Sequence, residues 1–76
     1  MIYAAVILCG LSGCTPETYP ETYGSEAACR AAHDARRPLV VLYARGIGAH
    51  TVRELCGTLD EIRRHIPDAF AGEQTT

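Results

Sequence analysis

Residues 25–46 read S-E-A-A-C-R-A-A-H-D-A-R-R-P-L-V-V-L-Y-A-R-G, and the expected fold depends on how this stretch is divided. Ser25 stands where a helix N-cap belongs, and the charged residues after it have the i,i+4 spacing of helical ion pairs. Pro38 cannot supply the backbone N–H that a helix interior needs, and it biases the preceding residue toward extended geometry. We therefore predict a helix over residues 26–36 that ends before the proline.

Two apolar runs predict β-strands on either side of this helix. The run L-V-V-L-Y-A at residues 39–44 is rich in β-branched and aromatic residues, and I-Y-A-A-V-I-L at residues 2–8 is continuously apolar. Runs of this length, bounded by glycine or proline, are typical of buried strands that are covered on both faces. We predict strands near residues 2–8 and 39–45, joined by a right-handed crossover that makes them parallel.

The C-terminal half of the chain predicts a second helix, near residues 52–66. Thr51 and Glu54 have the spacing of a capping box. Apolar residues then recur at intervals of three and four, which places them on one helical face. These residues are Val52, Leu55, Leu59, Ile62 and Ile66.

The expected fold class is therefore α/β, a small β-α-β-α unit of two parallel strands and two helices. We expect a single domain over residues 1–66. Within it, residues 16–24, which contain the repeat P-E-T-Y-P-E-T-Y over residues 16–23, should act as an extended connector, because the prolines disfavour a helix. Residues 67–76 should form a polar C-terminal tail, with Phe70 as an anchor.

Composition excludes several classes of function. A chain of 76 residues leaves no room for a second core, and a net charge of -2 provides no field for nucleic acid. All seven cationic side chains are arginine, so chemistry that needs a lysine amine is impossible. The loop R-G-I-G-A-H-T at residues 45–51 lacks the third glycine and the lysine of phosphate-binding loops. We expect no cofactor.

The cysteines Cys9, Cys14, Cys29 and Cys56 allow two disulfides, a metal site or buried thiols. We expect at least one disulfide, involving Cys9 or Cys14, if the protein matures outside a reducing cytosol. Cys29 and His33 share a helical face, and with Cys9 and Cys14 they are the candidates for a Cys3His zinc site. The structural alternative is that the thiols are simply buried.

Two resemblances concern the N-terminal part of the chain. The segments M-I-Y-A-A-V-I-L-C at residues 1–9 and S-E-A-A-C-R-A-A at residues 25–32, with Cys14 between them, resemble small uncharacterised cysteine-containing proteins of alphaproteobacteria and their phages. That resemblance implies an origin and no particular activity. The tetrapeptide Leu11-Ser12-Gly13-Cys14 resembles the lipobox of bacterial lipoproteins. It implies cleavage before Cys14, lipidation of its thiol and an outer-membrane anchor.

We expect a non-enzymatic structural or protein-interaction protein, for example a phage-encoded accessory or virion component, stabilised by disulfides and partner contacts. Two alternatives stay open: an envelope lipoprotein cleaved before Cys14, and a small thiol-redox or zinc-binding protein. The partner should be a protein or a second copy, with membrane contact only if Cys14 is lipidated. The cysteine content favours a virion or an extracytoplasmic location. The expected interface comprises Val52, Leu55, Leu59, Ile62, Ile66, Tyr19 and Tyr23.

Overall fold

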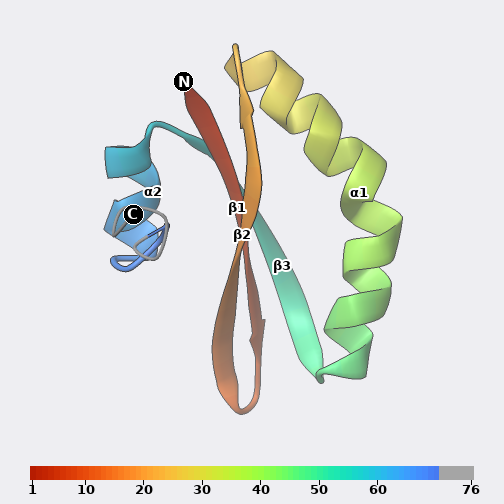
Figure 1. Ribbon diagram of the computed structural model, residues 1–76. Helices are drawn as coiled ribbons and strands as arrows, with labels where there is room; N and C mark the ends of the chain where they lie inside the picture. Colours follow the sequence, from red (N-terminus) through yellow and green to blue (C-terminus); the bar gives the residue numbers. More distant parts are fainter. Residues whose placement is uncertain (71–76) are drawn as a thin grey trace.

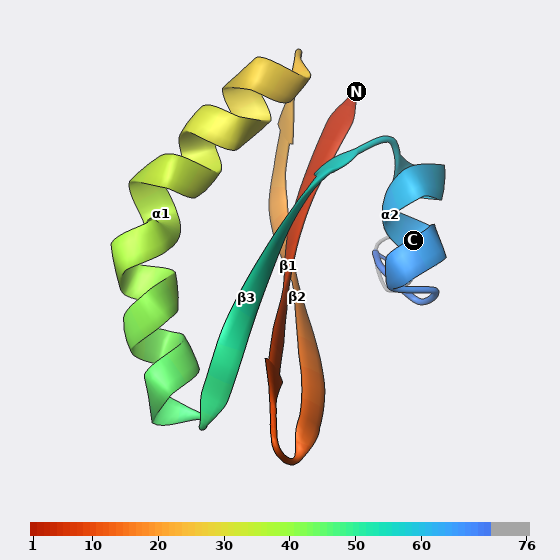
Figure 2. The same cartoon turned by 180° about the vertical axis from the view of Figure 1, so that it is seen from behind.

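The computed structural model describes residues 1–70 and places a three-stranded sheet between two helices (Figure 1 and Figure 2). The strand order is β2-β1-β3, and β1 pairs antiparallel with both of its neighbours. The expected β-α-β-α unit with two parallel strands is therefore wrong. The elements are β1 (Ile2–Gly10), β2 (Gly13–Tyr23), α1 (Glu26–Gly46), β3 (Ala49–Gly57) and α2 (Leu59–His65).

The strand expected over residues 2–8 is present as β1, the central strand of the sheet. Its consecutive residues Ala4, Ala5 and Val6 are at most 2% exposed. Because successive side chains of a strand point to opposite faces, this unbroken burial means that both faces of the sheet are covered. Helix α1 lies over one face and α2 over the other (Figure 1).

The Pro/Tyr repeat forms most of strand β2 rather than a connector. It occupies an edge of the sheet, where Pro16 lies opposite Ile7 of β1. Edge strands tolerate proline, because a missing N–H on the open side removes no ladder hydrogen bond. The threonines and tyrosines of the repeat favour extended backbone. A shift of register between Tyr3 and Ala5 of β1 accommodates the second half of the repeat.

Helix α1 continues through Pro38 to Gly46, so the strand predicted over residues 39–45 is wrong. Its start agrees with the sequence, because the Ala28 amide donates to the Ser25 hydroxyl at 3.1 Å. Pro38 lies on the exposed side, where water can satisfy the carbonyl that loses its partner. Burial of the opposite side of the helix against the sheet outweighs the lost hydrogen bond.

The helix predicted over residues 52–66 is also wrong, because the chain first forms β3 and then, after Thr58, the short helix α2. The capping box belongs to Thr58 and Glu61, not to Thr51 and Glu54. In this box the Thr58 amide donates to the Glu61 carboxylate at 2.8 Å, and the Glu61 amide donates to the Thr58 hydroxyl at 3.3 Å.

Each face of the sheet carries its own hydrophobic cluster. Under α2, Phe70 is buried as expected of an anchor, and its ring centroid lies 5.0 Å from that of Tyr3. Under α1, Val6 and Leu8 pack against Ala44. The rest of the predicted tail, residues 71–76, lies outside the described residues. None of the helices in residues 1–70 has the length and apolar character needed to cross a membrane.

Candidate functional site

The predicted disulfide involving Cys9 or Cys14 is present, and a second disulfide joins the other two cysteines. Cys9 and Cys14 lie directly opposite each other in the β1–β2 hairpin, with their Cα atoms 4.0 Å apart. Cys29 and Cys56 join α1 to β3, with Cα atoms 6.0 Å apart. The chain has no free cysteine. One crosslink therefore closes the β1–β2 hairpin, and the other joins α1 to the sheet.

The structure does not assemble the predicted Cys3His set. Cys9 lies near the hairpin end of β1, whereas Cys56 pairs with Ala4 five positions away, or about 17 Å along the strand. Instead, Cys29 and His33 come together with Cys56, and one ligand atom from each of these three residues lies within 4.8 Å of the others. The sequence prediction missed Cys56 because it placed that residue in a helix.

His33 is held rigidly in this cluster. The side chain is 3% exposed, and its Nε2 lies 2.9 Å from the carbonyl oxygen of Leu55. A carbonyl oxygen can only accept a hydrogen bond, so Nε2 donates, and in the neutral ring Nδ1 is the nitrogen with the lone pair. The Tyr19 ring meets the imidazole edge-on, with centroids 5.9 Å apart. These contacts fix both the tautomer and the orientation of the ring.

A polar hollow of about 400 Å³ opens beside the cluster, and we call it the acidic hollow. Arg37 bridges two of its carboxylates, since its guanidinium donates to Glu54 at 2.7 Å and to Asp34 at 2.7 Å. These hydrogen bonds, those to Glu54 first, hold the pKa of Arg37 above its ordinary value. The hollow is lined by Glu26, Arg30, His33, Asp34, Arg37, Glu54, Leu55 and Cys56.

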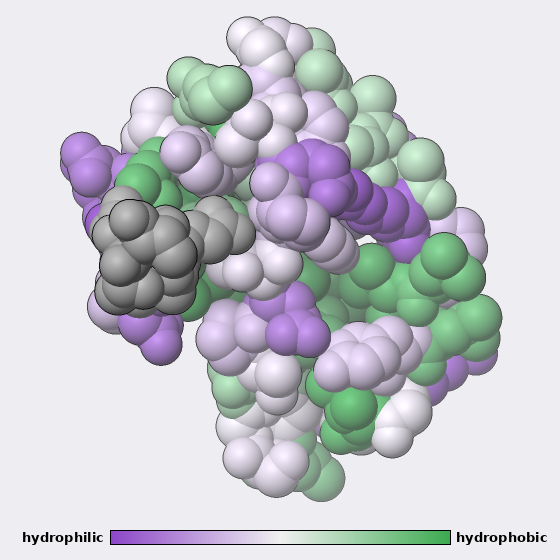
Figure 3. Space-filling view, viewed as in Figure 1, coloured by the Kyte–Doolittle hydropathy of each residue, from purple (hydrophilic) through white to green (hydrophobic). Residues whose placement is uncertain are grey.

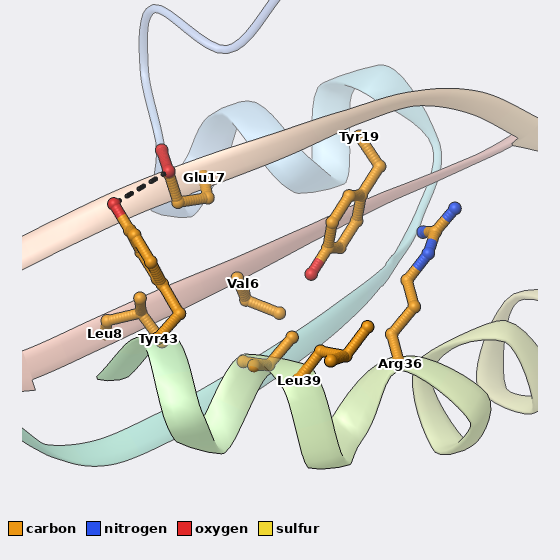
Figure 4. Close-up of a pocket in the computed structure, with 8 residues that line it drawn as sticks. Val6, Leu8, Glu17, Tyr19, Arg36, Leu39 and Tyr43 are labelled. Atoms are coloured by element: carbon orange, nitrogen blue, oxygen red, sulfur yellow. Dashed lines mark hydrogen bonds between the residues drawn. The ribbon is translucent and has the colours of Figure 1, made fainter. Parts of the chain in front are cut away.

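A second, mostly apolar hollow of about 380 Å³ lies between α1 and the strands β1 and β2 (Figure 4). Figure 4 shows Tyr43 reaching from α1 to Glu17 on β2, where its hydroxyl donates to the carboxylate at 3.5 Å. We call this hollow the α1–sheet groove. It is lined by Val6, Leu8, Glu17, Tyr19, Arg36, Leu39, Val40 and Tyr43.

The polar end of the α1–sheet groove is formed by Arg36 and Tyr19. The Arg36 guanidinium carbon lies 4.2 Å from the centroid of the Tyr19 ring, a distance that allows cation–π attraction. Arg36 also forms an ion pair with Glu21, but its Nη1 atom is buried without a hydrogen-bond partner within residues 1–70. Burial raises the pKa of the Tyr19 phenol, and the charge of Arg36 offsets part of this effect.

The C-terminal half of α1 and the residue after it expose several large apolar side chains, of which Leu39 and Tyr43 also line the groove. Leu39 is 72% exposed, Leu42 61%, Tyr43 49% and Ile47 41%. We call these four residues the α1 stripe. Figure 3 shows hydrophobic side chains gathered over the C-terminal half of α1. The sequence prediction missed the stripe because it divided α1 at Pro38 and read the residues after it as a strand.

The residues predicted as an interface have mostly structural positions. Leu55, Ile62 and Ile66 are buried in the core under α2, and Leu59 packs against that core. The remaining three residues lie elsewhere: Val52 packs under α1, Tyr19 lines the α1–sheet groove, and Tyr23 pairs with Ile2.

Two motifs from the sequence occupy turns. The lipobox-like residues 11–14 form the two-residue turn between β1 and β2 and the first two residues of β2, and the sulfur of Cys14 is bonded to Cys9. The G-x-G segment at residues 46–48 runs from the last residue of α1 to the residue before β3. It therefore faces the negative C-terminal end of a helix, which is the opposite of a phosphate-binding arrangement.

No protein-family model, curated protein or solved structure matches the chain. The geometry of residues 1–70 offers two places for function. One is the apolar surface formed by the α1–sheet groove and the α1 stripe, and the other is the cluster of Cys29, His33 and Cys56. The first has the chemistry of an interface, and the second has that of a redox or metal site.

Proposed function

We propose that this chain is a non-enzymatic protein-interaction protein that assembles with a second copy of itself through α1. The observation that carries the proposal is the exposure of Leu39 and Leu42, which are 72% and 61% exposed beside the α1–sheet groove. A contiguous exposed apolar patch on a small protein commonly marks an interaction surface. We therefore infer that a partner covers this patch.

A second copy fits this surface because the surface is complementary to itself. It combines protruding side chains, the α1 stripe, with a hollow beside them, the α1–sheet groove. In a two-fold symmetric pair the same patch is used by both subunits. With α1 antiparallel to its counterpart about an axis near Leu42 and Tyr43, Leu39 of each subunit would face Ile47 of the other. Both rows of apolar side chains would then be covered at once.

The available area reaches the range of weak specific interfaces. With roughly 200 Å² for each fully exposed large side chain, the α1 stripe leaves on the order of 450 Å² open on one chain. Two chains would bury about 900 Å² from the stripes alone, and the groove walls add to this. Specific interfaces begin near about 1,000 Å². The expected dimer is therefore one of modest affinity.

Pairing through the β2 edge of the sheet is less favourable than pairing through α1. The outer strand β2 carries Pro16 and Pro20, which lack the N–H groups that a strand from another chain would need. Charged or proline-containing edges are a common protection against such pairing.

The lipoprotein alternative conflicts with this fold. Cleavage before Cys14 would remove β1, the strand that pairs with both β2 and β3. It would also remove Ala4, Ala5, Val6 and Leu8 from the core. The two disulfides favour folding in an oxidising compartment or in a virion.

The oligomeric state of the oxidised chain tests the proposal. At roughly 100 µM, a complex with a Kd of about 1 µM would be almost fully associated. Sedimentation equilibrium should therefore give twice the monomer mass for the wild type. Leu42→Arg should give the monomer mass, because it places an unpaired charge in the apolar contact. Leu42 lines neither hollow, so the circular dichroism spectrum should stay unchanged.

A matched control is Leu11→Arg, which makes the same change at a leucine that is 96% exposed at the hairpin turn. This variant should associate as the wild type does. A wild-type chain that stays monomeric at this concentration would show that the stripe is not a self-association surface. Equal association of Leu42→Arg and wild type would show that another surface is used.

A further inference from the structure

We propose that the reduced protein binds a borderline-soft divalent cation, Zn²⁺, through Cys29, His33 and Cys56. In the oxidised protein the two sulfurs are joined as a disulfide, so opening that bond would create the site. This inference is independent of self-association through α1. It rests on the three residues that the fold brings to one place, where one ligand atom from each lies within 4.8 Å of the others.

The donor set matches the preferences of zinc. Two thiolates and one imidazole form a Cys2His set, which leaves a fourth position for water in sites of the open type. The acidic hollow lies next to Cys56 and would supply that water. It contains three carboxylates against two guanidinium groups among its lining residues, so its charge does not oppose a dication.

The backbone around the cluster is already arranged for binding. Cys29 and His33 are four residues apart on α1 and so lie on one face of the helix. Cys56 is on β3, with its Cα 6.0 Å from that of Cys29. After reduction, side-chain rotation can separate the sulfurs while the helix and the strand keep their positions.

The hydrogen bond of His33 gives an independent reason to expect a ligand. Metal-binding histidines usually donate their second ring N–H to a carboxylate or a backbone carbonyl, which fixes the tautomer. His33 makes such a contact, since its Nε2 lies 2.9 Å from the carbonyl oxygen of Leu55. Nδ1 is then the ring nitrogen with a lone pair to offer. Leu55 also precedes Cys56, so the carbonyl and a thiolate come from adjacent residues.

A dithiol reductant would open the site through Cys56, the more accessible of the two sulfurs. Cys29 is 0% exposed, whereas Cys56 is only half-buried and lines the acidic hollow. A thiolate of the reductant attacks the Cys56 sulfur, and Cys29 leaves as a thiolate. The second thiol of the reductant then displaces Cys56 and closes a disulfide within the reductant. Two electrons and two protons pass from the dithiol to the two cysteine sulfurs.

Metal binding then exchanges protons for the cation. One Zn²⁺ replaces the two thiol protons of Cys29 and Cys56 and accepts the lone pair of neutral His33. Two protons are therefore released for each bound ion at a pH where both thiols are protonated, so affinity should rise with pH. The bound ion would take over the crosslink between α1 and β3 that the disulfide makes in the oxidised protein.

The test uses the full chain with Cys9→Ala and Cys14→Ala, which leaves Cys29 and Cys56 as the only cysteines. The chain is reduced with a dithiol, freed of it by anaerobic gel filtration, and titrated with Co²⁺ as a spectroscopic probe for zinc. We expect one Co²⁺ per chain, with thiolate-to-metal charge-transfer absorption and tetrahedral d–d bands. Added Zn²⁺ should displace the probe and abolish both signals.

Further variants distinguish a defined three-ligand site from nonspecific metal binding by the two thiolates. His33→Ala in the same background should weaken Co²⁺ binding by more than about 10-fold, because changing even a residue that only supports a metal ligand commonly costs that much. His65→Ala is the control, because His65 is exposed at the end of α2 and should have no effect.

Several outcomes would overturn the proposal. One is a reduced chain that binds no metal. Another is equal affinity in the His33→Ala and parent chains. A third is a reduced chain whose circular dichroism spectrum is that of an unfolded protein both with and without Zn²⁺, because the bound ion should hold α1 on β3.

Discussion

Replacing Cys29 and Cys56 by alanine should destabilise the oxidised protein more than the same replacement of Cys9 and Cys14. A disulfide lowers the entropy of the unfolded chain by an amount that grows with the loop it closes. For a sequence separation of 27 residues the stabilisation is about 3.5 kcal/mol, and for a separation of 5 it is about 2 kcal/mol. Loss of the fully buried Cys29 sulfur adds a packing cost to the first variant.

Urea unfolding of the wild type and both double variants, followed by circular dichroism, measures this difference. With a slope of about 1 kcal/mol per molar urea, the two midpoints should differ by at least about 1.5 M. If the variant without the Cys29–Cys56 bond is already unfolded in the absence of urea, it is still the more destabilised of the two variants, as predicted. If the variant lacking Cys9–Cys14 were equally or more destabilised, loop length would not be the dominant effect and the reasoning would be refuted.

Three further predictions concern local contacts. Gly10→Ala should cost about 1–3 kcal/mol, because its Cβ would lie 2.4 Å from the carbonyl oxygen of Gly48, whereas Gly24→Ala meets no atom within 4 Å and should be nearly neutral; thermal melts compare the two. Thr58→Ala should cost about 1 kcal/mol by removing the N-cap of α2. Hydrogen bonds from Thr58 lower the pKa of the Glu61 carboxyl below its unfolded value of about 4.3. The stability that the ionised carboxylate contributes is therefore fully present above the unfolded pKa and is lost as pH falls through the lower native pKa. Glu61→Gln should flatten the stability-against-pH curve in that acidic range, and an unchanged curve would show that the carboxylate is not the source.

Some elements could be read from local sequence because a local interaction decides them. Ser25 begins α1 as predicted, since its hydroxyl satisfies the amide of Ala28 without help from distant residues. The apolar run of β1 was also recognised, since few other structures bury so many consecutive side chains.

Pro38 was misread because its effect depends on tertiary packing. Local rules end a helix before proline, yet Cys29, His33 and Ala44 keep a single helical face buried across it. The β-branched residues after the proline favoured a strand only in the absence of that packing. Because of this error the α1 stripe was not predicted, since its leucines were assigned to a buried strand.

The two T-x-x-E sequences show a second limit. Thr51 with Glu54 and Thr58 with Glu61 have the same spacing, and only the second pair caps a helix. Strand β3 shows no apolar alternation that would have corrected the error, because a helix covers each face of the sheet and apolar residues occur on both. Gly57 was the available signal, since glycine weakens a helix interior by about 1 kcal/mol. With β3 read as a helix, Cys56 could not be placed beside Cys29 and His33.

The central position of the first strand has a consequence for folding kinetics. The β1–β2 hairpin is local and can form within about 1–10 µs. Pairing of β1 with β3 joins Tyr3 to Gly57 and Gly10 to Ala49, contacts about 40 to 55 residues apart, and such non-local closure is slow. During synthesis one edge of β1 therefore remains unpaired until β3 has been synthesised. Cys9 and Cys14 can be oxidised during that interval, whereas Cys29 cannot meet Cys56 until it ends.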